Sequence, residues 1–239
     1  MNDAKVTLLR PVITTGSLPP GMAVSHVSEH LRETIIGGAL RRGQTLLVRD
    51  VANSIGAPVG IIREAFTRLS GEGYLLRRGR STIVAPFCLE AHTMLQRRLP
   101  LETRLTRLAT SRMTSFGFRL LQQIRQEMVE AQHRQDLAAV QRGNYRFHTV
   151  LYRFGNRPDL LAEVRSLWAA FPFDLMTTMP GRMSEVAAEH SAVLTMLRTG
   201  DPKKAGRAMH YLILHGWQEF QRNYPVQAAE RQPRRARPH

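Results

Sequence analysis

The residues of this chain best suited to chemistry are arginines that gather between positions 41 and 87. Arg63 falls in a helical pattern, on the face away from the apolar residues Ile62 and Phe66, so its guanidinium can reach outward. Three more arginines, Arg77, Arg78 and Arg80, lie close together in a turn between two short apolar runs. Guanidinium groups bind phosphate oxygens and the edges of guanine. This spacing therefore indicates nucleic-acid binding.

Two short helices joined by a turn at Gly56 must position these arginines. The spacing of apolar residues predicts helices over 24–36, 48–55 and 58–69, and strands over 74–76 and 82–84. This order is typical of a winged helix-turn-helix, whose second paired helix enters the major groove with its N-terminal residues. Arg49, at the start of the first paired helix, can reach a flanking phosphate. The candidate DNA contacts are Arg49, Gly60, Arg63, Arg77, Arg78, Arg80 and Ser81.

Composition favours a globular protein with an anionic partner. The chain has 239 residues, of which 43% are hydrophobic and 22% charged, and its net charge is +15. The basic excess is spread over the whole length, so charge alone does not locate a binding face. Cys88 is the single cysteine, which excludes an intramolecular disulfide framework. Neither a membrane-spanning apolar run nor a leader pattern is seen, so we expect a soluble, cytoplasmic protein without membrane contact.

After Phe87 the pattern becomes helical throughout. Apolar spacing predicts helices near 89–97, 100–114, 116–134, 137–154, 158–178, 183–199 and 202–222, the first two of which form one kinked helix in an alternative interpretation. We therefore predict a mostly α protein, with a winged helix-turn-helix followed by an all-α helical bundle. The expected organisation is a flexible arm over 1–22, a head over 23–87, a bundle over 88–224 and a disordered basic tail over 225–239.

The head resembles the GntR family of bacterial transcription regulators. The matching segments are Leu47-Val48-Arg49-Asp50-Val51-Ala52, Ile55-Gly56, Arg63-Glu64-Ala65, Leu69, Glu72-Gly73-Tyr74 and Val84-Ala85-Pro86-Phe87. Members of the family usually carry a Ser/Thr-Arg pair after the turn, where this chain has Pro58-Val59 followed by Gly60. The departure removes a hydroxyl cap and a basic contact, so the resemblance implies that Arg49, Arg63 and the wing carry more of the DNA binding.

The bundle resembles the FCD domain, the ligand-binding domain of one GntR subfamily. The matching residues are Arg98, Leu101, Glu102, Asn144, Phe147, His148, Glu189, His190, Gly200, Asp201 and Ala205. Many such domains hold a divalent metal, which we take to be Zn, Ni or Mn, through an Asp and three His, and the metal helps to bind a small carboxylate. The resemblance thus implies an effector site at Arg98, Asn144, His148 and His190.

The metal ligands carry over only in part. His148 and His190 match, whereas Asn144 stands at the Asp position and Leu212 at the last His position. His215 lies roughly 60° around the helix from Leu212 and is a candidate substitute. Three interpretations stay open: a metal at His148 and His190, a pair of hydrogen-bonded core histidines, or direct binding of an anionic or polar effector. Trp168, Phe171 and Phe173 either line such a pocket or belong to the core.

The resemblance implies a homodimeric, effector-responsive transcription regulator. Its DNA target is then a pseudo-palindromic operator, and repression is the more common outcome in the family. The alternative is a DNA-binding regulator whose bundle is a dimerisation scaffold that senses neither metal nor effector. An enzyme is not expected, because no Ser-His-Asp or Cys-His arrangement, phosphate-binding glycine loop or HExxH motif is present.

Overall fold

The computed structural model describes residues 20–87, 91–176, 178–179 and 181–224, and most of the expected arm, Cys88 and the basic tail lie outside this range. The head consists of α1 (Pro20–Ile36), β1 (Thr45–Leu46), α2 (Val48–Ile55), α3 (Val59–Gly71), β2 (Leu75–Arg78) and β3 (Ser81–Val84). The three strands form an antiparallel sheet in the order β1-β3-β2. Strand β1 is absent from the sequence-based assignment, whereas the paired helices and the wing hairpin are confirmed.

The turn between α2 and α3 depends on glycine. Gly56 caps α2 with φ 74° and donates its N–H to the carbonyl of Ala52 at 2.8 Å. Glycine reaches this left-handed conformation without the Cβ clash that other residues meet. Val51, Ala52 and Ile55 of α2 are buried together with Ile62, Ala65, Phe66 and Leu69 of α3. The turn thus brings the two apolar faces into one core.

The bundle follows as α4 (Ala91–Thr110), α5 (Ser115–His133), α6 (Leu137–Phe154), α7 (Pro158–Ala170), α8 (Phe173–Met176), α9 (Arg182–Arg198) and α10 (Pro202–Asn223). Helix α4 packs against α6, α7 and α10, and α5 packs against α6 and α9. Side chains of Thr114, Asp136 and Asp201 cap the first turns of α5, α6 and α10. None of the helices in the described residues is long and apolar enough to cross a membrane.

In the head, α1 begins at Pro20, inside the expected arm, rather than at Val24. Two helix boundaries in the bundle also differ from those expected, both at prolines. Helix α4 continues through Pro100, so the two segments expected on either side are one helix. The helix expected over 158–178 ends at Ala170 instead, because Pro172 forces the preceding Phe171 into an extended conformation with φ −81° and ψ 138°. The chain restarts after it as the short α8, so the predicted fold class is confirmed with a break that places aromatic residues at a corner.

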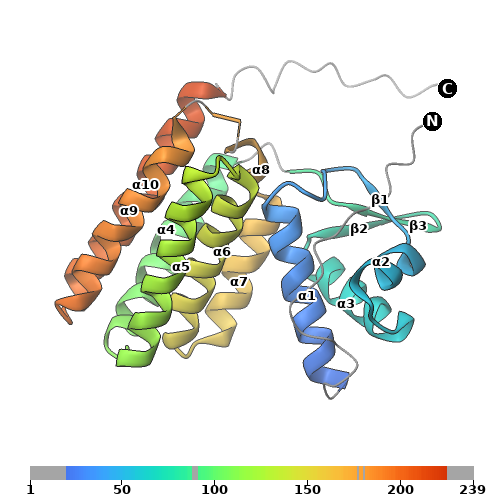
Figure 1. Ribbon diagram of the computed structural model, residues 1–239, viewed down its shortest axis with the longest axis horizontal. Helices are drawn as coiled ribbons and strands as arrows, with labels where there is room; N and C mark the ends of the chain where they lie inside the picture. The colour runs from blue at the N-terminus through green and yellow to red at the C-terminus, as the bar shows by residue number, and fades with distance from the viewer. Residues whose placement is uncertain (1–19, 88–90, 177, 180, 225–239) are drawn as a thin grey trace.

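Helix α1 joins the head to the bundle. It packs against α3 on one side and against α6 on the other, and lies between them in Figure 1. Arg32 of α1 forms two hydrogen bonds of 2.6 Å with Glu72, at the end of α3. The direct tie from the head to the bundle in this region is Arg42, which donates to the carbonyls of Ala169 and Phe171 at 2.7 and 3.1 Å. The head is thus attached partly through charged side chains with limited access to water.

The glycines at the helix-turn-helix permit a direct stability test. Replacing Gly56 by alanine imposes a positive φ on a residue with a Cβ and is expected to lower the free energy of unfolding by about 1 kcal/mol. Gly60, inside α3 with no atom within 4 Å of an added Cβ, is the matched control. Gly60→Ala is expected to raise the free energy by roughly 0.5–1 kcal/mol. Urea unfolding followed by circular dichroism measures both, and equal effects would contradict the assignment of the turn.

Candidate functional site

Five basic side chains of the head are exposed on the helix-turn-helix and the wing. Arg49 lies in the first turn of α2, Arg63 in the first half of α3, and Arg77 and Arg78 on β2, with Arg80 at the hairpin tip. All five are exposed, and within the described residues none of them forms an ion pair. Gly60 is exposed as well, whereas Ser81 is half-buried opposite Arg78. The candidate DNA contacts thus form an uncompensated cationic surface on α2, α3 and the wing.

The start of α3 has an unusual surface for a recognition helix. Pro58 occupies the capping position without a side-chain hydrogen bond to the helix. The side chain of Val59 is 40% exposed, and Gly60 has open space around it. Val59 lies one turn before Arg63, on the same side of the helix. A DNA base edge at this point would therefore meet an apolar side chain beside Arg63.

The bundle encloses a cavity of about 40 Å³, which we call the bundle cavity. Its walls come from the end of α1 and from α4, α6, α7, α8, α9 and α10. The lining residues are Ile36, Arg98, Asn144, Tyr145, His148, Trp168, Phe171, Phe173, Met176, Arg182, Leu212, Ile213, Gly216 and Trp217. Arg98, Asn144 and His148 are thus brought together, while His190 lies behind His148. A space of this size holds roughly three water molecules.

Glu102 organises one wall of the bundle cavity. Its buried carboxylate accepts hydrogen bonds from Arg98 Nε at 2.7 Å, Trp168 Nε1 at 3.1 Å and the Tyr152 hydroxyl at 2.8 Å. The Arg98 guanidinium also lies over the rings of Phe171 and Phe173, at 4.6 and 5.1 Å from their centroids. A buried charge is tolerated when it is paired and fully hydrogen-bonded. Glu102 and the two rings therefore fix the position of the Arg98 guanidinium at the cavity.

The hydrogen bonds fix the tautomers of the two histidines. Because Tyr152 gives its only proton to Glu102, His148 Nδ1 must donate to the Tyr152 oxygen, at 2.9 Å. His190 Nδ1 donates to the carbonyl of Val186 at 2.6 Å. The two Nε2 atoms, which face each other at 3.3 Å, are then both lone-pair acceptors.

Burial keeps both histidines neutral. Burial, reinforced by the charge of Arg98, lowers the pKa of His148 to about 3. Burial, followed by the neighbouring His148, lowers the pKa of His190 to about 3 as well. Neither ring therefore carries the extra proton that would bridge the two nitrogens at neutral pH.

Two facing imidazole nitrogens are suitable donors for a first-row divalent ion, but the rest of the family's ligand set is not present. Asn144 offers a neutral amide and Leu212 an alkyl chain, and no carboxylate is among the described residues that line the cavity. His215 does not line it either, since its Nδ1 contacts Glu189 at 2.7 Å. Two guanidinium groups, Arg98 and Arg182, share the space instead. The cavity residues therefore do not fit the family's metal site, and their charges favour an anion.

Arg182 is the cavity residue that the sequence patterns did not indicate. It is 4% exposed and forms two hydrogen bonds of 2.9 Å with Glu189, but its Nε is buried without a hydrogen-bond partner in the described part of the chain. Only its spacing of seven residues from Glu189, two turns along α9, pointed to the pair. Tyr145 was missed as well, whereas Trp168, Phe171 and Phe173, considered as either lining or core, do line the cavity.

Comparison with known proteins agrees with this architecture. Residues 23–84 match the gntR family of bacterial regulatory proteins, and residues 93–215 match the FCD domain. The chain is 24% identical, over 64% of its length and 71% of the relative's, to the HTH-type transcriptional regulator McbR of Escherichia coli K12.

Two solved structures share the fold. One is E. coli McbR/YncC, with a TM-score of 0.71 and 19% identity over 84% of this chain and 98% of that one. The other is a Rhodococcus sp. RHA1 protein named as a putative transcriptional regulator GntR, with a TM-score of 0.59 and 20% identity over 83% of this chain and 98% of that one. Both matched families are regulatory rather than enzymatic, as expected from the absence of a catalytic motif. The chain belongs to the GntR family of transcription regulators and carries the FCD effector-binding domain.

Proposed function

We propose that this regulator acts as a homodimeric repressor that binds a pseudo-palindromic operator and releases it when a small anion occupies the bundle cavity. One observation carries the effector part of the proposal: two buried guanidinium groups, Arg98 and Arg182, line one cavity together with aromatic rings. A guanidinium group can bind a carboxylate through two parallel N–H···O hydrogen bonds. A compact carboxylic acid with an apolar body therefore matches the lining.

The two guanidinium groups differ in which of their nitrogens are already hydrogen-bonded. Arg98 uses Nε for Glu102, and its terminal nitrogens form no hydrogen bond within the described residues. Arg182 uses both terminal nitrogens for Glu189 and leaves Nε unpaired. Each arginine thus keeps donors for a ligand while its own glutamate balances its charge. Asn144 can add an amide donor, whereas Nε2 of the neutral His148 offers an acceptor only.

The DNA part of the proposal is supported by the exposed arginines of α2, α3 and the wing. In a winged helix-turn-helix, Arg63 faces base edges, whereas Arg78 and Arg80 face the backbone or the minor groove. Two heads related by the dimer axis would read two half-sites, as the family implies.

The second candidate function is a DNA-binding regulator whose bundle is only a dimerisation scaffold. The observations that favour it are the small size of the cavity, about 40 Å³, and the replacement of two metal ligands by Asn144 and Leu212. It predicts that no small carboxylate stabilises the protein, which separates it from the proposal above.

The assignment of Arg63 to base readout is tested by alanine substitution. On an operator selected from a random library with the wild-type protein, Arg63→Ala is expected to cost about 1–3 kcal/mol of binding and to relax specificity at one position. Arg78→Ala and Arg80→Ala should weaken binding to all sequences and each reduce the salt slope by about 1. Arg198→Ala, at an exposed site on α9, is the control. Fluorescence anisotropy over a salt series measures these effects, and an unchanged Arg63→Ala affinity would place the recognition helix elsewhere.

The anion site is tested by thermal unfolding with acetate, lactate, malonate and benzoate, against chloride at equal ionic strength. A carboxylate at 100 times its Kd should stabilise the wild type by about 2.7 kcal/mol. Arg182→Lys, which keeps the charge but loses the planar fork, should weaken this binding roughly tenfold or more. A double variant, Arg182→Met with Glu189→Gln, leaves no unpaired buried carboxylate and should abolish carboxylate binding.

Two controls accompany that experiment. Arg198→Ala should respond to each carboxylate as the wild type does. Zn²⁺, Ni²⁺ and Mn²⁺ should cause no stabilisation that depends on His148, measured by comparison with His148→Ala. Stabilisation by a metal but by none of the carboxylates would contradict direct anion binding.

A further inference from the structure

Tyr145 belongs to two environments at once. Its ring lines the bundle cavity, and its hydroxyl donates a 2.8 Å hydrogen bond to Glu29 Oε1 on α1 of the head. The residue is 3% exposed. Burial, followed by the charge of Glu29, raises the pKa of the Tyr145 hydroxyl well above its usual value, so the group remains a donor. One side chain therefore contacts both the cavity and the head.

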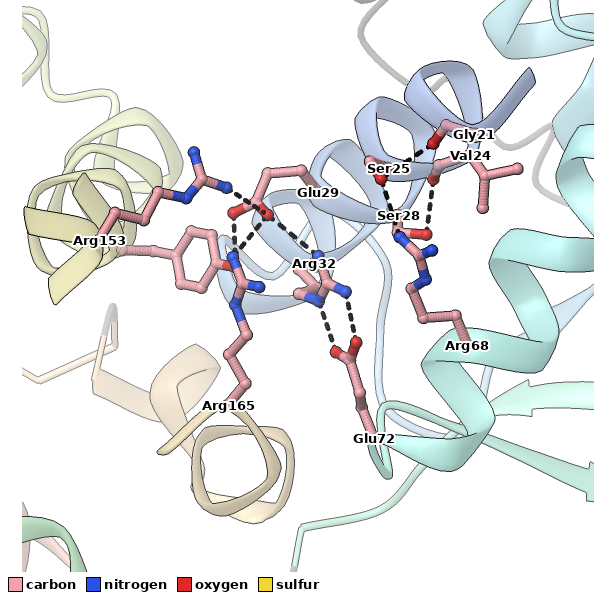
Figure 2. A network of polar contacts seen from close by, with 11 residues as sticks. Gly21, Val24, Ser25, Ser28, Glu29, Arg32, Arg68, Glu72, Arg153 and Arg165 are labelled. Carbon is pink, nitrogen blue, oxygen red and sulfur yellow. Dashed lines mark hydrogen bonds and ion pairs between the residues drawn. The ribbon is translucent and has the colours of Figure 1, made fainter. Parts of the chain in front are cut away.

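Glu29 is the meeting point of a charged network between three helices (Figure 2). Its Oε2 accepts from Arg32 of α1 at 3.0 Å, Arg153 of α6 at 3.2 Å and Arg165 of α7 at 2.8 Å. Arg32 continues the network to Glu72, the C-terminal cap of α3. A chain of direct contacts thus runs from the cavity wall through Tyr145, Glu29, Arg32 and Glu72 to the helix that carries Arg63.

The parts of this network cannot move independently. Arg32 has a side-chain exposure of 3% and Glu29 one of 21%, so a lost partner would leave a charge with little water to replace it. Buried networks of this kind favour discrete arrangements over gradual displacement. A shift of the Tyr145 hydroxyl is therefore expected to change the seating of α1 rather than to be absorbed locally.

The cavity side of Tyr145 is equally constrained. Its ring packs edge-on against Trp168, with centroids 5.5 Å apart, and Trp168 shares the carboxylate of Glu102 with Arg98. Because the cavity holds only about 40 Å³, a ligand larger than a few atoms must displace part of its lining. Arg98 is the group that an anion attracts, and Trp168 connects it to Tyr145.

We propose that Tyr145 is the positioning residue that transmits cavity occupancy to the DNA-binding head, by holding Glu29 while the cavity is empty and releasing it when an anion enters. Release of Glu29 loosens α1, and with it the placement of α3 relative to the bundle. This inference rests on the proposed effector function, but the role of the contact between Tyr145 and Glu29 can also be tested in the ligand-free protein.

The first experiment measures operator affinity of the ligand-free full chain by fluorescence anisotropy. Tyr145→Phe keeps the ring in the cavity and removes only the hydroxyl, so its operator affinity should fall at least fivefold, which is the lower end of typical coupling. Tyr224→Phe is the matched control, because it also removes one tyrosine hydroxyl of the bundle, but that hydroxyl hydrogen-bonds Thr178 and the residue does not line the bundle cavity. Its operator affinity should stay within twofold of the wild type. Hydrogen exchange should be faster in α1 of Tyr145→Phe than in α1 of Tyr224→Phe.

The second experiment uses malonate or benzoate, whichever stabilises the wild type. At saturation, the carboxylate should weaken operator binding of the wild type and of Tyr224→Phe, but change that of Tyr145→Phe by less than twofold. Carboxylate binding itself, measured by titration calorimetry, should persist in Tyr145→Phe. If the hydroxyl had only a structural role, Tyr145→Phe would be less stable, but the carboxylate would weaken its operator binding as much as it weakens that of the wild type.

The outcomes separate the two proposals. If Tyr145→Phe binds the operator as tightly as the wild type and its α1 exchanges hydrogen at the same rate, the transmission role is overturned, whether or not a carboxylate binds. A carboxylate response that Tyr145→Phe retains in full also overturns it, while the effector function stands. If no carboxylate binds but Tyr145→Phe still loses operator affinity, the effector class fails and the contact between Tyr145 and the head is supported.

Discussion

The hydrogen-bonded network around Glu29 of α1 is the interaction on which the arrangement of the two halves depends. Its carboxylate is shared with Arg153 and Arg165 of the bundle, while Arg32, one turn later on α1, ties the helix to Glu72 at the end of α3. Helix α1 is thus a structural member of both parts. Beside the apolar packing of Val27, Leu31 and Ile35, these contacts are charged, so their strength depends on exclusion of water and on the completeness of each partner set. A head attached by apolar packing alone would lack this dependence.

The same rule governs the bundle cavity. Two arginines are buried there, and each has its own glutamate, Glu102 for Arg98 and Glu189 for Arg182. The pairs make the buried charges tolerable, but neither pair uses every guanidinium donor. The histidines show the opposite case, since burial removes their charge and leaves two lone pairs in contact. The cavity therefore contains unsatisfied donors and unsatisfied acceptors side by side, an arrangement suited to a polar ligand and poorly suited to an apolar core.

The fold followed from the sequence wherever local rules decide it. Gly56 and the apolar spacing of α2 and α3 specify the helix-turn-helix, and Asp136 caps α6 as its position before an apolar run predicts. The break at Phe171 was missed because a helical apolar pattern extends across Pro172. Strand β1 has two residues, too few for any periodic signal. Arg182 was missed because its spacing from Glu189 along α9 is a weak signal, and its place at the cavity depends on how α9 packs against α10, which no pattern within a single helix reveals.

The departures from the family in the recognition helix and in the bundle cavity have different physical consequences. At Pro58 and Val59 a polar cap and a cation are replaced by an apolar surface, yet the helix still begins there because proline suits a position whose N–H has no helical partner. At Asn144 and Leu212 the family's Asp carboxylate and its last His ligand are lost from a cavity that retains Arg98 and Arg182. Removal of one negative group and one metal ligand beside two guanidinium groups leaves the cavity more positive. In the family the metal supplies that positive charge for a carboxylate. Here the arginines already present can supply it, so the loss of the metal ligands is physically consistent with the proposed anion site.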